Sequence, residues 1–143
     1  RKIYYEKNEE IKLKSANLIN KNLIPIICVG ETLEEKEKGL TKSILEDQLK
    51  NSIPTSSNFK NTIIAYEPVW AIGTGLTPTI EEIDDTHNFI RSHADKFNKY
   101  KILYGGSVKG NNAKEITTLP NVDGALIGGA SLILEEFTKI IQD

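Results

Sequence analysis

The sequence lacks methionine altogether and contains a single cysteine, Cys28, among its 143 residues. One cysteine cannot form a disulfide within the chain, which favours a reducing compartment and a cytoplasmic location. No apolar run approaches the roughly 18 to 20 residues that a transmembrane helix needs, and the charged N-terminus has no apolar stretch typical of a signal peptide. Because the initiator methionine is missing, we expect the sequence to be incomplete.

A strong excess of charge is also missing. The 18 basic and 20 acidic residues give a net charge of -2, so composition provides no reason to expect nucleic acid or a membrane as a partner. No group of His, Cys and Asp residues has metal-ligand spacing. The short "GTG" at 73–75 lacks the later glycine and acid of a dinucleotide fingerprint. The spacing of these residues therefore gives no signal for a metal site, and the match to a dinucleotide-binding motif is weak.

Four short apolar runs alternate with segments of helical spacing. Because the runs lack polar alternation, we interpret them as strands covered on both faces. Alternation of this kind predicts an α/β protein with parallel strands, in one domain over residues 1–143. It leaves open whether the sheet is open or is half of a closed barrel. The expected strands are 23–30, 61–69, 99–108 and 121–131, and the expected helices are 9–22, 41–53, 80–97, 112–119 and 132–141.

The expected helix 80–97 has an apolar stripe that includes His87, which we interpret as a packed histidine. His93 lies near the edge of that stripe and is expected on the surface. Thr79 and Glu82 have the spacing of a capping box at the start of this helix. Cys28 falls inside an apolar run, so we interpret it as a small core residue and not as a nucleophile.

Chemistry is expected at the carboxyl ends of the strands, where ligands bind in parallel α/β proteins. Two runs end in glycine pairs, Gly105-Gly106 and Gly128-Gly129, whose bare N–H groups suit a phosphate. A third run ends in Glu67, which Pro68 restricts to an extended conformation and which suits a general base. A single glycine pair is more often a turn, and a Glu-Pro pair more often a solvated strand end, so these alternatives stay open.

The stretch from Pro68 to Pro78 is interpreted as a mobile lid. Prolines stiffen its two ends, whereas Gly73 and Gly75 make its middle permissive. Trp70 gives this lid a large apolar anchor. Glu31, after the first strand, is either an acid at a helix start or a partner of the lid.

Four motifs resemble the triosephosphate isomerase family, in the family's order. They are "CVGE" (28–31), "AYEPVWAIGTG" (65–75), "YGGSV" (104–108) and "VDGALIGGASL" (122–132). The resemblance covers essentially the whole chain, and the second motif is specific to that family. It implies a (β/α)₈ TIM barrel, of which this chain is the C-terminal half, with no second domain.

The resemblance also implies a reaction. The family interconverts dihydroxyacetone phosphate and D-glyceraldehyde 3-phosphate in glycolysis and gluconeogenesis, without cofactor or metal, and it is a standard example of lid closure. Glu67 matches the general base that abstracts the proton. The matched phosphate-binding residues are Gly73, Ser107, Gly128 and Gly129, and the matched lid and hinge residues are Pro68, Val69, Trp70, Gly75, Tyr104 and Glu31.

Three features depart from the family pattern. Leu76 replaces a frequent lysine at the lid tip, and Pro78 offers no N–H to the tyrosine, Tyr104, that latches the lid in the family. The family's asparagine, lysine and catalytic histidine would precede Arg1. We therefore expect a homodimeric isomerase as the full-length parent and little activity from this chain alone. The alternative hypothesis is a half-barrel that binds phosphate esters without turning them over.

Overall fold

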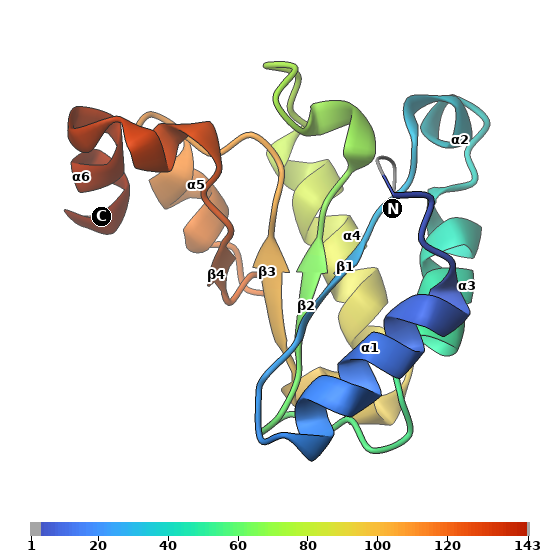
Figure 1. Ribbon diagram of the computed structural model, residues 1–143. Helices are drawn as coiled ribbons and strands as arrows, with labels where there is room; N and C mark the ends of the chain where they lie inside the picture. Colours follow the sequence, from blue (N-terminus) through green and yellow to red (C-terminus); the bar gives the residue numbers. More distant parts are fainter. Residues whose placement is uncertain (1–3, 143) are drawn as a thin grey trace.

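The computed structural model describes residues 4–142, except for the side chains of residues 95 and 96. Helices and strands alternate along the chain, as the sequence predicts (Figure 1). The α-helices are α1 (Asn8–Asn20), α2 (Leu33–Glu37), α3 (Thr41–Ser52), α4 (Ile80–Ser92), α5 (Ala113–Thr117) and α6 (Leu134–Gln142). The strands are β1 (Ile26–Val29), β2 (Ile63–Tyr66), β3 (Lys101–Tyr104) and β4 (Gly124–Ala125), and the 3₁₀ helices are η1 (Val69–Ala71), η2 (Asp95–Lys99) and η3 (Gly129–Leu132).

The four strands form one parallel sheet in the order β1-β2-β3-β4. Val29 is in register with Tyr66, Tyr66 with Tyr104, and Tyr104 with Ala125. The carboxyl ends of all four strands therefore meet at one edge of the sheet. Parallel strands connected by helices in sequential order are the architecture of a partial (β/α) barrel, which confirms the predicted fold class.

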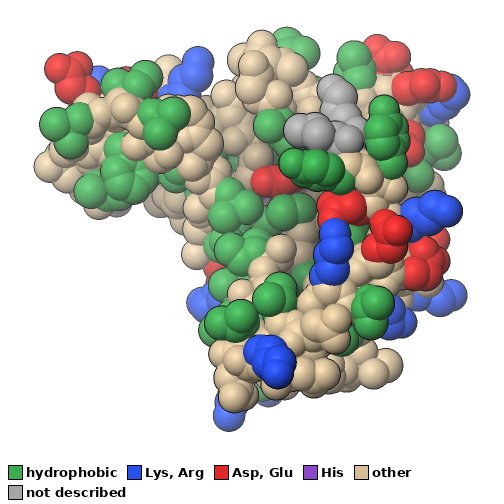
Figure 2. Space-filling view, in the orientation of Figure 1, with side chains coloured by type: hydrophobic (Ala, Val, Ile, Leu, Met, Phe, Trp, Pro, Cys, Tyr) green, Lys and Arg blue, Asp and Glu red, His purple; other side chains and the backbone are tan. Residues whose placement is uncertain are grey.

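The two faces of this sheet differ in burial in β1 and β3, so the expectation of strands buried on both faces is wrong for these strands. On the covered face, alternate residues such as Ile27, Ile64 and Ile102 are at most 1% exposed. On the other face Ile26 is 46% exposed, and Cys28 is half-buried instead of in the core. Figure 1 shows α4 behind the sheet, and Figure 2 shows apolar side chains gathered at the centre of the opposite face.

The helix predicted over 80–97 ends at Ser92, so the prediction of helix for residues 93–97 is wrong. The chain turns into η2, where Phe97 packs edge-to-face on Tyr100 with ring centroids 5.3 Å apart. Phe97 therefore reaches the core from a 3₁₀ turn and not from the helical stripe. The predicted capping box is confirmed, since the Thr79 hydroxyl accepts from Glu82 N–H and the Glu82 carboxylate accepts from Thr79 N–H.

The two histidines differ in burial, and His93 is less exposed than the sequence predicts. His87 is fully buried between the rings of Tyr66 and Tyr104, which confirms that it is a packed residue. The ring of His93 stacks at 6.3 Å on Phe97, so it is half-buried. Among residues 4–142, none of the helices is both long and apolar enough to cross a membrane.

Candidate functional site

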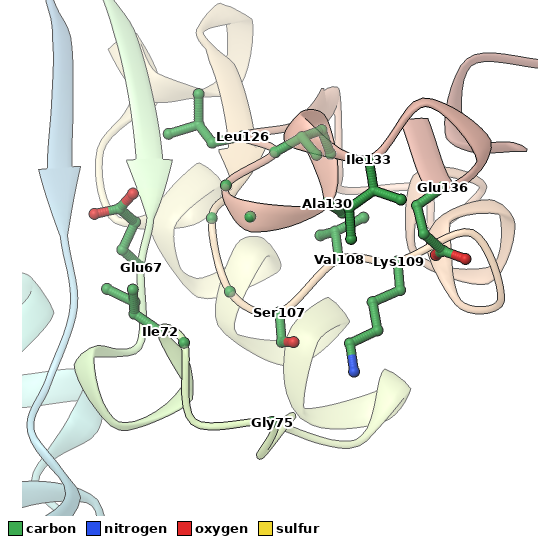
Figure 3. Close-up of a pocket in the computed structure, with 16 residues that line it drawn as sticks. Glu67, Ile72, Gly75, Ser107, Val108, Lys109, Leu126, Ala130, Ile133 and Glu136 are labelled. Atoms are coloured by element: carbon green, nitrogen blue, oxygen red, sulfur yellow. The ribbon is translucent and has the colours of Figure 1, made fainter. Parts of the chain in front are cut away.

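A pocket of about 850 Å³ lies over the carboxyl ends of the strands (Figure 3). Its wall combines residues from four separate places in the chain: the end of β2, the lid, and the segments after β3 and β4. Among the lining residues are Glu67, Gly73, Gly75, Gly105, Gly106, Ser107, Lys109, Gly128, Gly129 and Glu136. The base and phosphate residues expected from the sequence thus lie around one cavity.

Glu67 is held in the gap between two glycines of the neighbouring strands. Its N–H donates to Val29 O at 2.7 Å, which extends the sheet pairing past the end of β2. A Cβ atom at Gly30 would lie 1.8 Å from Glu67 O, and one at Gly105 would lie 2.4 Å from Glu67 Cγ. Glycine is therefore required at positions 30 and 105 because a larger residue would collide with Glu67. For Gly105 the sequence suggests a different reason, namely a bare N–H group that binds phosphate.

The carboxylate of Glu67 stands at the wall of the pocket opposite Lys109 (Figure 3). The residue is half-buried, and its backbone is fixed by the strand pairing while its side chain borders the cavity. Figure 3 shows its carboxylate oxygens directed away from Ser107 and Lys109. Its role as a general base stays a prediction.

The first segment of the lid is fastened to Glu31. The Trp70 indole Nε1–H donates to Glu31 Oε1 at 2.8 Å, and Val69 N–H donates to Glu31 O at 2.9 Å. The Tyr66 hydroxyl donates to the same carboxylate at 3.2 Å. Burial and the negative charge of Glu31 raise the pKa of Tyr66. Glu31 thus connects the end of β1 to the lid. Of the two alternatives that the sequence leaves open for Glu31, the structure favours contact with the lid.

Lys36 covers the outer face of the same tryptophan. Its Nζ lies 3.8 Å from the centroid of the Trp70 ring and 3.1 Å from Glu82 Oε1 at the start of α4. Hydrogen bonds from Thr79 N–H and the neighbouring Lys36 keep the pKa of Glu82 below its usual value, despite an opposing effect of partial burial. The sequence alone gives no signal for Lys36, because only the fold brings α2 against the lid.

Tyr104 makes no latch in this structure. Its hydroxyl is buried and has no hydrogen-bond partner among the described residues. Burial, followed by the charge of Glu31, raises the pKa of Tyr104. Gly106 lies directly on the ring, since a Cβ there would be 2.1 Å from the hydroxyl oxygen. Pro78, which ends the lid, is itself buried and has no N–H to donate.

The glycines of the lid and of the β4 loop differ in backbone conformation. Gly73 and Gly75 have φ angles of +68° and +79°, which non-glycine residues rarely adopt. After β4, Gly129 begins the 3₁₀ turn η3, and the helix α6 begins only at Leu134. Ser131 N–H and Oγ–H both bond to Gly128 O and close this turn, which competes with an α-helical path.

Asn112 arranges the segment after β3. It stands at the N-cap position of α5, but its side chain makes no cap hydrogen bond. Instead its Oδ1 accepts from Lys109 N–H at 2.8 Å, and its Nδ2 donates to Ser107 O at 3.1 Å. One amide side chain thus fixes Ser107 relative to Lys109. Lys109 and Glu136, both of which line the pocket, were not identified from the sequence.

The geometry defines a class of protein: a partial (β/α) barrel with a glycine-lined pocket and a carboxylate at the carboxyl ends of its strands. The family model described as triosephosphate isomerase matches residues 1–143. The chain belongs to the triosephosphate isomerase family.

Individual relatives support this assignment. The triosephosphate isomerase of Rhizobium meliloti is 50% identical over 137 residues, which covers 92% of this chain and 54% of the relative. That of Chloroherpeton thalassium is 47% identical and covers 99% of this chain and 60% of the relative. The crystal structure of triosephosphate isomerase from Bartonella henselae superposes with a TM-score of 0.88 at 38% identity, covering 99% of this chain and 59% of that one. The chain thus spans somewhat more than half the length of these relatives.

Proposed function

We propose that the chain is the C-terminal part of a triosephosphate isomerase barrel and supplies its general base and its phosphate site. The substrate is a small phosphorylated triose. One observation carries the proposal: Glu67 borders the same cavity as Gly73, Ser107 and the Gly128-Gly129 pair. A carboxylate and an anion-binding cradle on one pocket are what proton transfer on a phosphate ester requires.

In the proposed mechanism, backbone N–H groups of Gly73, Ser107 and the Gly128-Gly129 pair bind the phosphate. The Glu67 carboxylate then takes a proton from the carbon next to the substrate's carbonyl group, which gives an enediol, and returns a proton to the former carbonyl carbon. The hydroxyl proton moves at the same time from one substrate oxygen to the other. Substrate and product have the same composition, so the reaction consumes no oxidant and no reductant. Closure of the lid from Pro68 to Pro78 excludes water and strengthens the electrostatic interactions inside the site.

The remainder of the site is proposed to lie in the part of the relatives that this chain does not span. The family resemblance implies that this part contains an asparagine, a lysine that provides positive charge and a histidine that polarises the carbonyl. We propose that a cytoplasmic homodimer of the full-length protein is the active form. The isolated chain then has little activity, since removal of a single electrophilic donor alone costs about 10² to 10³ in rate.

The proposal is tested by joining this chain to the missing segment of the Rhizobium meliloti relative and measuring isomerisation of D-glyceraldehyde 3-phosphate. We expect turnover in the joined protein and a loss of about 10² to 10⁴ in kcat for Glu67→Gln. Glu67→Asp should lower kcat while leaving the affinity for glycerol 3-phosphate, an unreactive phosphate ester, nearly unchanged. Leu76→Ala, at the exposed lid tip, is the control.

Two outcomes contradict the proposal. If the joined protein folds but does not turn over D-glyceraldehyde 3-phosphate, the proposed isomerase reaction is wrong. A Glu67→Asp variant that loses glycerol 3-phosphate binding but not kcat assigns Glu67 to binding instead of proton transfer. If the isolated chain binds glycerol 3-phosphate and the joined protein remains inactive, the half-barrel that only binds phosphate esters is the better description.

A further inference from the structure

Lys109 points from the phosphate side of the pocket toward the lid. Figure 3 shows its side chain and that of Ser107 on the same side of the segment after β3, both directed toward Gly75. Val108, between them, is turned the other way and is 5% exposed. The shared hydrogen bonds to Asn112 hold the backbone of Ser107 and Lys109 in this relation. The backbone of Lys109 is therefore held in a fixed position beside the expected phosphate-binding residues.

The charges around the pocket leave Lys109 as the cation available to a ligand. Glu136, on the same wall, accepts from Gly110 N–H at 2.9 Å and lies 3.6 Å from Lys139 Nζ. Its negative charge is offset mainly by Lys139 and to a smaller extent by Lys109 itself. Within residues 4–142, Lys109 Nζ has no carboxylate within ion-pair distance. Glu67, the other acid of the pocket, lies on the opposite wall (Figure 3).

We propose that Lys109 is a further binding residue for the phosphate group of the substrate, and that its ammonium attracts the dianion and holds it in the cradle. This inference rests on the proposed function. The cradle itself consists of uncharged N–H groups, whereas Glu67 repels an incoming anion. A flexible ammonium at the mouth of the pocket offsets that repulsion and raises the local concentration of the anion. The attraction weakens as salt screens the charges.

The test is a titration of the chain with glycerol 3-phosphate, followed by calorimetry or by amide chemical shifts, at low and high salt. We expect Lys109→Gln to weaken binding by about threefold to tenfold at low salt and by less at high salt. Lys109→Arg, which keeps the charge, should retain most of the affinity. Lys50→Gln, on the exposed side of α3, makes the same change in net charge away from the pocket and should have no effect.

The outcomes separate this inference from the proposed function. If the unmodified chain binds glycerol 3-phosphate and Lys109→Gln binds equally well, the role of Lys109 is wrong and the phosphate site stands. If the unmodified chain binds neither glycerol 3-phosphate nor inorganic phosphate, both are wrong. An equal loss in Lys109→Gln and Lys50→Gln shows a general charge effect and overturns the assignment of Lys109. An unchanged melting temperature of Lys109→Gln excludes unfolding as the cause of weaker binding.

Discussion

The Trp70 indole donates a hydrogen bond of 2.8 Å to the carboxylate of Glu31, a residue that is 1% exposed. This contact connects the end of β1 to the first residues of the lid across a long stretch of sequence. Charged carboxylates are rarely buried unless they are hydrogen-bonded. The position of the lid and the solvation of Glu31 are therefore coupled, because movement of Trp70 removes the shortest bond that the carboxylate makes.

Trp70→Phe is expected to lower the free energy of unfolding by about 1 to 3 kcal/mol, because it leaves the buried Glu31 carboxylate with fewer donors. Urea denaturation measures the change. Leu76→Ala is the matched lid variant, since Leu76 is 54% exposed, and should change the free energy of unfolding by no more than about 0.5 kcal/mol. Equal stability of Trp70→Phe and the unmodified chain would show that the bond contributes nothing.

Alanine at Gly30 is expected to be more destabilising than alanine at Gly105. At Gly30 the new Cβ meets the Glu67 carbonyl oxygen at 1.8 Å, and that backbone is fixed by sheet pairing. At Gly105 it meets Glu67 Cγ at 2.4 Å, so the side chain can rotate away. We expect Gly30→Ala to lower the free energy of unfolding by more than about 3 kcal/mol. Gly105→Ala should lower it by about 1 to 3 kcal/mol.

Gly129→Ala is the control for these two variants. None of the described atoms outside its immediate chain neighbours lies within 4 Å of a Cβ built at Gly129. Its stability, measured in the same urea titration, should match or slightly exceed that of the unmodified chain. A Gly129→Ala protein as unstable as Gly30→Ala would mean that loss of glycine flexibility, and not contact with Glu67, causes the effect.

The sequence predicts most of the sheet because apolar runs and helical stripes are local signals. It predicts Glu67 and the glycine pairs as neighbours because parallel strands place their carboxyl ends together. It does not predict Lys36 against Trp70 or Lys109 at the pocket, since lysines outside the apolar stripes carry no periodic signal. Strand and helix ends were overestimated where tertiary packing decides them, as at Phe97, which packs on Tyr100 from a 3₁₀ turn.

His87 is expected to make stability depend on pH. Burial, followed by the positive charge of Arg91, lowers the pKa of His87 from 6.5 to about 4. Between these values the unfolded chain binds a proton that the folded chain does not, so stability falls as pH decreases from 6.5 to 4. The contribution of His87 is complete above pH 6.5, and about 2 to 3 kcal/mol of it should be lost by pH 4.5.

The measurement compares urea unfolding of the unmodified chain and of His87→Leu at pH 7 and pH 4.5. Asp84 and Asp123, whose charges also act on His87, are present in both proteins, so their own titration largely cancels. The unmodified chain should lose more stability on acidification than the variant. If both lose the same amount, His87 is not neutral in the folded state in this pH range.

The uncovered face of the sheet predicts self-association of the isolated chain. Ile26 is 46% exposed, and the strands β1 and β4 each have one neighbour in the sheet. Exposed apolar faces and unpaired strand edges promote association between chains. We expect a concentration-dependent increase in mass by sedimentation or light scattering. Ile26→Lys should reduce it, whereas Lys50→Gln, remote from this face, should not; a monodisperse monomer at high concentration would contradict the prediction.

Removal of the Tyr104 hydroxyl is expected to affect the free energy of unfolding and the closure of the lid in different ways. Its hydroxyl is buried without a hydrogen-bond partner in the described part of the chain, and such a group costs stability instead of adding to it. Tyr104→Phe should therefore be neutral or should raise the free energy of unfolding by up to about 1 to 2 kcal/mol. If the hydroxyl latches the closed lid, as the family resemblance implies, the same variant should bind glycerol 3-phosphate more weakly in the joined barrel. Higher stability with unchanged affinity would show that, with Pro78 at the end of the lid, Tyr104 makes no latch in the closed state either.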